Sequence, residues 1–136
     1  MKKLILIIST LLLTLTTYGQ DITGQWNGVL KVQGIQLRVV FNINSIDNNF
    51  VSTMDSPDQN AKGIPVTTTG FESPALKLTI SNLGVEYKGV LGDNNIIVGT
   101  FKQAGQSFPM DLSKEKIKLN KDVFLPTNLI WLSLCT

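Results

Sequence analysis

The sequence predicts an all-β fold, a small antiparallel up-and-down barrel of about eight strands. Two observations lead to this prediction. Short segments alternate apolar with polar residues, and turn-forming residues separate them about every 10 residues. No stretch of the domain shows the apolar spacing of a helix. Because an open sheet of this length would leave two edges free to aggregate, we expect it to close into a barrel rather than form a sandwich.

The first strand is expected over residues 22–32. Trp26 and Leu30 fall on one side of its alternation, whereas Asn27 and Lys31 fall on the other. A tryptophan at the first inward position of the first strand is well placed to close one end of a small barrel. The neighbouring glycines let other backbone pass close to its ring.

The later strands show the same alternation and are separated by turn-forming residues. They are expected over residues 37–44, 50–55, 64–71, 76–81, 85–91, 96–102 and 107–112. A polar loop over residues 56–63 is the longest connection. The inward-facing side chains are bulky: Trp26, Leu30, Leu37, Val39, Phe41, Leu78, Tyr87, Phe101, Phe108 and Met110. They are large enough to fill much of a narrow interior, and the alternation alone leaves open whether a cavity remains.

Residues 1–20 have the composition of a secretory signal peptide. Lys2 and Lys3 precede an apolar run over residues 4–15, and Thr17 and Gly19 supply small residues at the usual cleavage spacing. The run is shorter than the roughly 20 residues that a transmembrane helix needs, so we expect no membrane span in the mature chain. The sequence therefore predicts an exported protein, periplasmic or extracellular, whose barrel domain occupies residues 21–113.

The composition changes after the barrel domain. Residues 114–136 begin as a charged linker and continue as an apolar tail that lacks periodicity and is too short to span a bilayer. Two interpretations of the tail stay open: the abnormal end of a truncated longer protein, or a hydrophobic segment that docks on another surface. Cys135, the single cysteine of the chain, lies in this tail, so no internal disulfide can form.

The charge pattern argues against nucleic acid as a partner. The chain has 12 basic and 10 acidic residues, and removing Lys2 and Lys3 with the signal peptide leaves a neutral mature chain. Its single arginine, Arg38, and its lysines are dispersed along the strands rather than gathered in one basic patch.

The residue types needed for common catalytic sites are absent. The chain has no histidine, which excludes Ser-His-Asp and Cys-His nucleophiles and histidine-ligated metals. It also has no Gly-x-Ser-x-Gly nucleophile elbow. Asp55 and Asp58 stand near the polar loop, but Lys62 and Thr69 occupy positions where a calcium loop of the EF-hand type needs its ligands. We therefore expect no enzymatic activity, no cofactor and no metal site.

Candidate ligand contacts come from the barrel interior and its mouth. Trp26, Phe41, Tyr87 and Phe101 are the large aromatic residues at inward positions, and Arg38 lies on a strand near the expected mouth. The alternative for Arg38 is an ordinary surface charge with a partly covered stem.

Gly24-Gln25-Trp26, at the start of the strand series, resembles the Gly-x-Trp signature of lipocalin-like barrels, in which the tryptophan closes the barrel floor. A longer resemblance covers nearly all of residues 22–118. Its segments are Gly24-Gln25-Trp26-Asn27-Gly28, Leu37-Arg38-Val39-Val40-Phe41, Thr53-Met54-Asp55-Ser56-Pro57-Asp58-Gln59, Gly63-Ile64-Pro65-Val66, Gly99-Thr100-Phe101-Lys102-Gln103 and Gln106-Ser107-Phe108-Pro109. Together they resemble the amino-terminal β-domain of exported α/β-hydrolases of Bacteroidetes-type bacteria.

In that family a serine hydrolase domain of the aminopeptidase or esterase type follows the β-domain. No residue of this chain matches the family's nucleophile, acid or histidine, so the resemblance transfers no catalytic residue. It implies a non-catalytic accessory domain of a truncated hydrolase, with a hydrolase domain as its partner. The Gly-x-Trp resemblance implies the alternative, a free-standing lipocalin-like carrier of a small apolar ligand.

Overall fold

The computed structural model describes residues 20–118, so the predicted signal peptide except Gln20, the end of the charged linker and the whole apolar tail lie outside the described residues. Most of the described chain is β-strand, joined by short turns. Between residues 20 and 118, no helix is both long enough and apolar enough to cross a membrane.

Ten antiparallel strands form one sheet in this part of the chain. They are β1 (Gly24–Val32), β2 (Ile35–Ile46), β3 (Asn49–Ser56), β4 (Ala61–Pro65), β5 (Thr68–Glu72), β6 (Ala75–Ile80), β7 (Val85–Leu91), β8 (Ile96–Gln103), β9 (Gln106–Pro109) and β10 (Leu112–Ser113). Two single-turn 3-10 helices, η1 (Pro57–Gln59) and η2 (Ser81–Leu83), connect β3 to β4 and β6 to β7. The strand order is β4-β3-β2-β1-β10-β8-β7-β6-β5, and β9 pairs with β8.

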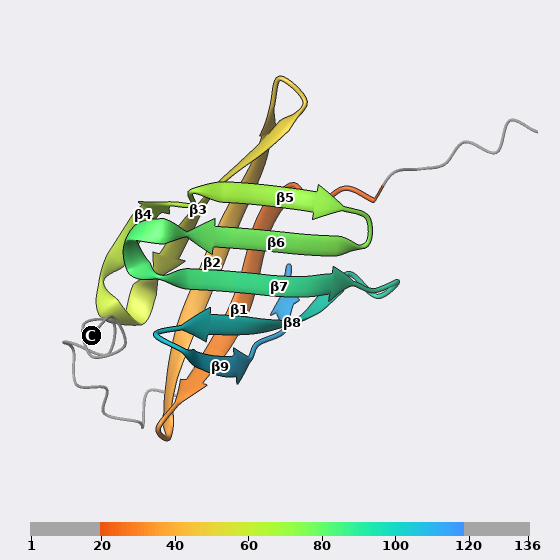
Figure 1. Ribbon diagram of the computed structural model, residues 1–136. Helices are drawn as coiled ribbons and strands as arrows, with labels where there is room; N and C mark the ends of the chain where they lie inside the picture. Colours follow the sequence, from red (N-terminus) through yellow and green to blue (C-terminus); the bar gives the residue numbers. More distant parts are fainter. Residues whose placement is uncertain (1–19, 119–136) are drawn as a thin grey trace, which may run out of the picture.

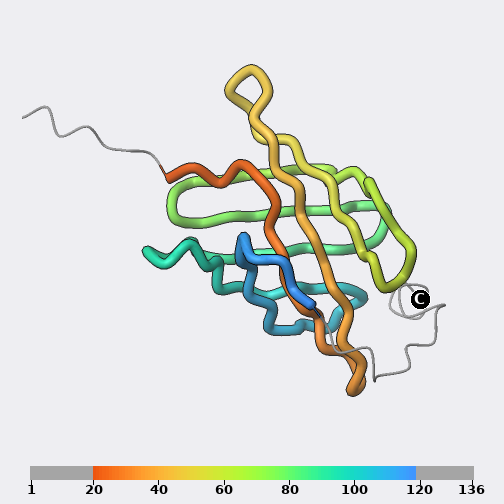
Figure 2. The backbone as a smooth tube through the Cα atoms, turned by 180° about the vertical axis from the view of Figure 1, so that it is seen from behind, coloured from red at the N-terminus to blue at the C-terminus, as the bar shows by residue number. Residues whose placement is uncertain are grey.

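The sheet curls over until its two halves face each other. In Figure 1, β5 to β8 run across the view and β1 to β3 cross behind them at a steep angle. Figure 2 shows the same crossing from behind, with the β2–β3 hairpin projecting past β5. The prediction of an all-β, barrel-like antiparallel fold is confirmed.

One hydrophobic core fills the space between the two halves. The predicted inward positions are buried in every case except Phe108, which is half-buried on β9. Its smaller burial follows from its position, because β9 pairs only with β8. Successive side chains of a strand point to opposite faces, so alternation in the sequence becomes alternation of burial. Each large apolar side chain fully buried in this way stabilises the fold by about 1.5–3 kcal/mol.

The single strand predicted over residues 64–71 is wrong, because the chain changes layers within it. After β4 ends, the N–H of Val66 donates to the carbonyl of Ser52 on β3 at 3.0 Å. The next N–H, of Thr67, donates to the carbonyl of Thr79 on β6 at 2.7 Å. The run of β-branched residues hides this break, since the chain is extended on both sides of it.

The polar loop predicted over residues 56–63 is tighter than expected. Helix η1 takes up its first half, and Asn60 follows in the left-handed region with a φ of 56°. The N–H of Asn60 donates to the carbonyl of Pro57 at 3.2 Å. Asparagine tolerates this backbone conformation, so the chain reverses quickly and β4 begins at the next residue.

The last predicted strand, over residues 107–112, also divides in two. β9 stays beside β8, whereas β10 lies between β8 and β1. Leu112 stands opposite Ile97 on β8, and Ser113 stands opposite Asn27 on β1. The two-residue strand β10 therefore joins the first strand of the sheet to a late one and closes one side of the barrel.

The other side of the barrel is joined by side chains. There β3 lies beside β5, and the hydroxyl oxygens of Ser52 and Thr69 share a hydrogen bond at 2.5 Å. The rings of Phe50 and Phe71 meet edge to face with centroids 6.2 Å apart. Within residues 20–118 no backbone hydrogen bond joins β3 to β5. We refer to this junction as the β3–β5 seam.

Candidate functional site

Four of the five predicted ligand-contact residues meet in the barrel interior. Trp26 stands opposite Phe41 in the β1–β2 ladder, and Tyr87 stands opposite Phe101 in the β7–β8 ladder. The ring centroids of Phe41 and Tyr87 are 5.8 Å apart, which links the two ladders across the core. All four side chains belong to one cluster and none has exposed surface. These aromatic groups therefore occupy the space in which a bound ligand would lie.

Both the indole N–H and the ring face of Trp26 make polar contacts. Its indole Nε1 donates to the carbonyl of Ile22 at 2.7 Å. The ammonium of Lys114 lies 5.1 Å from the ring centroid and donates to the carbonyl of Thr23 at 2.9 Å. A cation over an indole contributes about 0.5–1 kcal/mol when it stays solvated. Trp26 thus ties the segments before β1 and after β10 together.

Tyr87 is held as a structural hydrogen-bond donor. Its phenol oxygen donates to the carbonyl of Met110 at 2.9 Å. Burial raises the pKa of Tyr87, and the negative charge of Asp111 raises it further, so the phenol stays protonated. A Cβ at Gly99 would overlap this oxygen, and a Cβ at Gly89 would lie 2.9 Å from it. The two glycines therefore make room for the Tyr87 ring between neighbouring strands.

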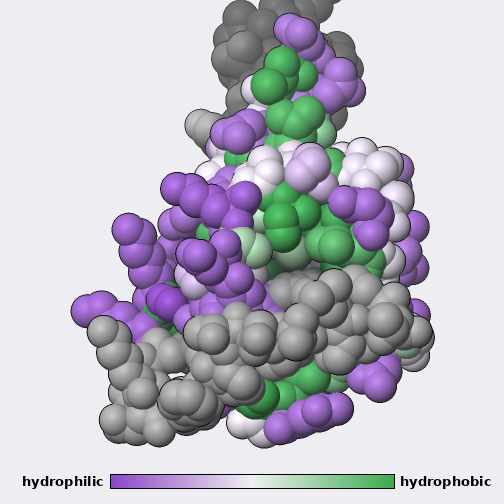
Figure 3. Space-filling model, turned by 90° about the vertical axis from the view of Figure 1, so that its left-hand side faces the viewer, coloured by the Kyte–Doolittle hydropathy of each residue, from purple (hydrophilic) through white to green (hydrophobic). Residues whose placement is uncertain are grey.

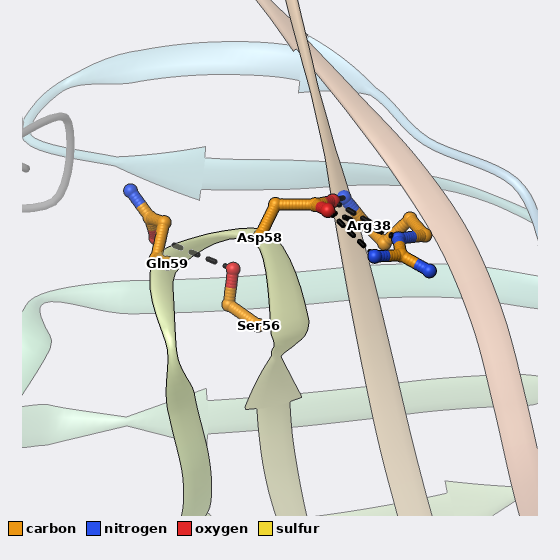
Figure 4. A network of polar contacts seen from close by, with 4 residues as sticks. All are labelled: Arg38, Ser56, Asp58 and Gln59. Carbon is orange, nitrogen blue, oxygen red and sulfur yellow. Dashed lines mark hydrogen bonds and ion pairs between the residues drawn. The ribbon is translucent and has the colours of Figure 1, made fainter. Parts of the chain in front are cut away.

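Arg38 lies apart from the aromatic group, on the outward side of β2. Figure 4 shows its guanidinium meeting the carboxylate of Asp58 from η1. Nη2 donates to Oδ1 at 2.7 Å, and the backbone N–H of Arg38 donates to Oδ2 at 2.8 Å. In the same turn the hydroxyl of Ser56 donates to Oε1 of Gln59 at 3.3 Å. Arg38 therefore fastens η1 to β2.

This contact shifts the pKa values of both partners. Burial favours a higher pKa for Asp58, but hydrogen bonds from the side chain and backbone of Arg38, together with its charge, hold that pKa below its usual value. The hydrogen bond to Asp58 raises the pKa of Arg38. The Asp58 side chain is only 9% exposed but that of Arg38 is 36% exposed, so the ion pair is partly shielded from water.

Asp55, the other acidic residue near the polar loop, is also engaged in hydrogen bonds. Its Oδ2 accepts from the Asn42 amide at 3.1 Å, and its Oδ1 accepts from the backbone N–H of Gly63 at 2.7 Å. Throughout residues 20–118, no group of three or more acidic, cysteine or histidine side chains is placed to hold a metal ion. Asp55 and Asp58 serve the turn that contains them.

A surface groove that sequence reasoning missed lies on the outer face of β5 to β8. Its volume is about 670 Å³. Ala75, Val90 and Val98 stand side by side across β6, β7 and β8, and the two valines are 53% and 62% exposed. We refer to this hollow as the outer groove. The signal that marks it in the sequence is a pair of valines at positions where alternation predicts polar residues.

Charged residues flank the apolar row of the outer groove. Lys77 and Lys88 stand opposite each other on β6 and β7 and share the carboxylate of Glu86, at 3.5 and 3.2 Å. The hydrogen bond from Lys88 and the charges of both lysines hold the pKa of Glu86 below its usual value. Glu72, on β5, lines the other end of the groove. The groove thus combines an apolar floor with two ammonium groups on one side.

The β2–β3 hairpin carries a second exposed apolar surface. Ile46 is 56% exposed and Val51 is 42% exposed, and both lie on the side of the hairpin that faces away from the core. Figure 3 shows the hairpin projecting at the top of the molecule, with apolar residues among hydrophilic ones.

Comparison of the chain with protein-family models, curated proteins and solved structures found no match. The function must therefore be argued from the aromatic interior, the Arg38–Asp58 ion pair, the outer groove and the edges of the sheet.

Proposed function

We propose that this chain is a non-catalytic accessory β-barrel domain of an exported protein, comparable to the module that precedes a secreted α/β-hydrolase. The observation that supports this proposal is the filled interior. Trp26, Phe41, Tyr87 and Phe101 are fully buried in one cluster. A carrier of a small apolar ligand needs an internal cavity of roughly 300 Å³ or more. The packed aromatic side chains therefore favour the accessory role over the carrier.

The chemistry of the polar residues also favours binding over turnover. The chain has no histidine to serve as a proton shuttle. The Tyr87 phenol is buried and bonded to a carbonyl, and Asp58 is bonded to an arginine. Groups held in this way stabilise a scaffold, and none of them is directed at a site that a substrate could enter.

The outer groove offers the contact surface that the accessory role requires. Val90 and Val98 form an exposed apolar pair on adjacent strands. Apolar residues of this kind, rimmed by charges, are typical of a contact with another folded domain. We propose that this face packs against a hydrolase domain, supplied either from the same gene in a longer form or from a neighbouring gene.

Sequencing the locus downstream of this chain comes first, and we expect a Gly-x-Ser-x-Gly hydrolase there. The encoded hydrolase is then mixed with the purified chain, and its binding is measured by calorimetry. Val90→Asp should weaken binding about tenfold or more, because it buries a charge in an apolar contact. Thr79→Asp, on the same outer face but outside the groove, is the matched control. Absence of a hydrolase gene and of binding would contradict the proposal.

A fluorescence titration tests the carrier alternative directly. The chain has two tryptophans, so the Trp131→Phe variant leaves Trp26 as the only indole. Because Trp26 is fully buried, a ligand entering the interior must change its emission. We expect no saturable change with palmitate. A saturable shift would favour the carrier and overturn the accessory proposal.

A further inference from the structure

The two terminal strands of the sheet differ in how they are protected. β4 carries Lys62 and Pro65, a charged residue and a residue without an N–H, both of which discourage pairing with another strand. β5 has the sequence Thr-Thr-Gly-Phe-Glu and contains neither lysine nor proline. Its edge away from β6 faces the β3–β5 seam, where side chains alone make the contact within residues 20–118. The backbone groups along this edge are therefore left for another partner.

The β2–β3 hairpin provides a wall behind this edge. Figures 1 and 2, seen from opposite sides, both show the hairpin crossing the sheet and extending past β5. The register of the hairpin places Ser45 opposite Phe50 on the side that faces the barrel interior. Phe50 and Phe71 are only partly buried and meet edge to face at this point. A strand added beside β5 would lay its inner side chains against these two rings.

The outer side of an added strand would border the outer groove. Gly70 stands opposite Lys77, and Lys77 stands opposite Lys88. These three residues form one row across β5, β6 and β7, in which Gly70 has no side chain and the other two carry ammonium groups. Both lysines share the single carboxylate of Glu86. Glu72, two residues along β5, adds one negative charge to the same face, but Lys77 stands directly opposite Gly70, so a carboxylate entering the space above Gly70 would meet this ammonium group first.

We propose that the free edge of β5 binds an extended peptide segment of another protein by strand addition. The main chain of the peptide bonds to β5, its inner apolar side chains contact Phe50 and Phe71, and an outer acidic side chain reaches Lys77. This site goes beyond the accessory role, because its partner is an unfolded segment with alternating apolar and acidic residues rather than a folded hydrolase domain.

The test uses the full chain and an acetylated, amidated heptapeptide of alternating valine and glutamate. Calorimetry should show saturable binding, and backbone amide signals should shift at residues 68–72. The same peptide with N-methyl groups on alternate residues lacks one row of donors and should bind about tenfold more weakly. A peptide with lysine in place of glutamate should bind about fivefold more weakly. Equal binding of the N-methylated peptide, or amide shifts confined to other strands, would overturn the proposal.

A negative charge introduced at Gly70, tested with both peptides, distinguishes a lost charge contact from a misfolded variant. A Cβ at Gly70 meets no atom closer than 3.9 Å, so Gly70→Glu is accommodated by the fold. The new glutamate side chain occupies the space above position 70 that the acidic side chain of the peptide would enter. It should weaken binding of the glutamate peptide about tenfold and strengthen binding of the lysine peptide. Ser107→Glu, on the same face but on β9 and outside the outer groove, is the control and should leave the affinity of the glutamate peptide within about twofold. Loss of binding to both peptides in Gly70→Glu would contradict the assigned charge contact.

Two other occupants of the β5 edge give distinct results. A second copy of the chain would produce concentration-dependent dimers in sedimentation experiments, and Gly70→Glu would dissociate them. The chain's own terminal segment would compete with the peptide, so removal of residues 119–136 would raise peptide affinity about tenfold or more. Either result would assign the edge to this protein itself and overturn the proposed partner.

Discussion

The barrel is joined on its two sides in different ways. At the β1–β10–β8 junction, β10 pairs through its backbone with both neighbours, and the Tyr87 phenol donates to the carbonyl of Met110 beside it. Gly28 allows this approach, since a Cβ there would lie 3.0 Å from the carbonyl of Asp111. At the β3–β5 seam, a hydroxyl pair and two partly buried rings make the contact.

These two kinds of contact differ in how firmly they hold neighbouring strands. Backbone pairing with a buried hydrogen bond fixes one relative position of the strands, because any shift breaks several bonds together. Side-chain contacts at an edge permit small movements at lower cost, and such regions open before the rest of a structure does. We therefore expect substitutions at the β1–β10–β8 junction to reduce global stability and substitutions at the β3–β5 seam to act locally.

The largest effect is expected for Gly99→Ala. A Cβ at this position would overlap the Tyr87 phenol and the carbonyl of Lys88, and the backbone carbonyl has little freedom to move. We predict a loss of about 3 kcal/mol in the free energy of unfolding, measured by urea denaturation. Gly70→Ala, where a Cβ has ordinary space, is the control and should change stability by less than about 0.5 kcal/mol. An unchanged urea midpoint for Gly99→Ala would show that the junction tolerates expansion.

The next effect is expected for Tyr87→Phe. The variant keeps the ring but removes the O–H that donates to the Met110 carbonyl, so this acceptor loses that buried hydrogen bond. We predict a loss of about 1–2 kcal/mol in unfolding free energy. Near-ultraviolet circular dichroism should remain close to that of the parent protein, because the aromatic core keeps its packing. A variant as stable as the parent would mean that this hydrogen bond adds nothing to the closure of the barrel.

The fold class could be predicted from the sequence because alternation reports burial directly. The alternation along each strand predicts four large aromatic side chains to point inward, and all four are buried in the structure: Trp26, Phe41, Tyr87 and Phe101. The alternation of residues along one strand does not say which strands become neighbours. The layer change at Val66, and the splitting of the last predicted strand, depend on hydrogen bonds between distant segments and could not be anticipated.

The candidate sites show the same limit. Arg38 could be placed on an outward strand face from the sequence, but its partner Asp58 is 20 residues away and is brought to it by η1. The outer groove needs the register of β6, β7 and β8, which sets Ala75, Val90 and Val98 in one row. The two valines at outward positions were the available signal, and alone they indicate an exposed apolar residue rather than a groove.

A pH-dependent prediction concerns Asp58, which belongs to neither side of the barrel. Its pKa in the folded protein lies below the unfolded value of about 3.8, so the unfolded chain takes up the proton first as the pH falls. The stability that Asp58 contributes is therefore fully present well above pH 3.8 and is lost as the pH falls from about 3.8 through the lower folded value.

Asp58→Asn should remove this dependence. We predict a loss of about 1 kcal/mol at pH 7, since the ion pair is partly exposed and its net contribution is modest. The difference in unfolding free energy between variant and parent should shrink as the pH falls below about 3.8. Asp93→Asn, in the turn between β7 and β8, changes the same formal charge away from η1 and serves as the control. A constant difference at every pH would assign the effect to packing instead of ionisation.

The smallest global effect is expected at the β3–β5 seam, for Thr69→Val. The substitution removes the hydroxyl that bonds Ser52, with a predicted loss of about 0.5–1 kcal/mol. Hydrogen exchange is the sharper measurement, because amides of β5 should exchange faster while those of β1 keep the parent rate. Thr68→Val, on the outward side of β5, retains the bond and is the control. Equal acceleration of exchange in β1 and β5 would mean that the seam is coupled to the whole barrel, and the separation between a fixed side and an adaptable side would then fail.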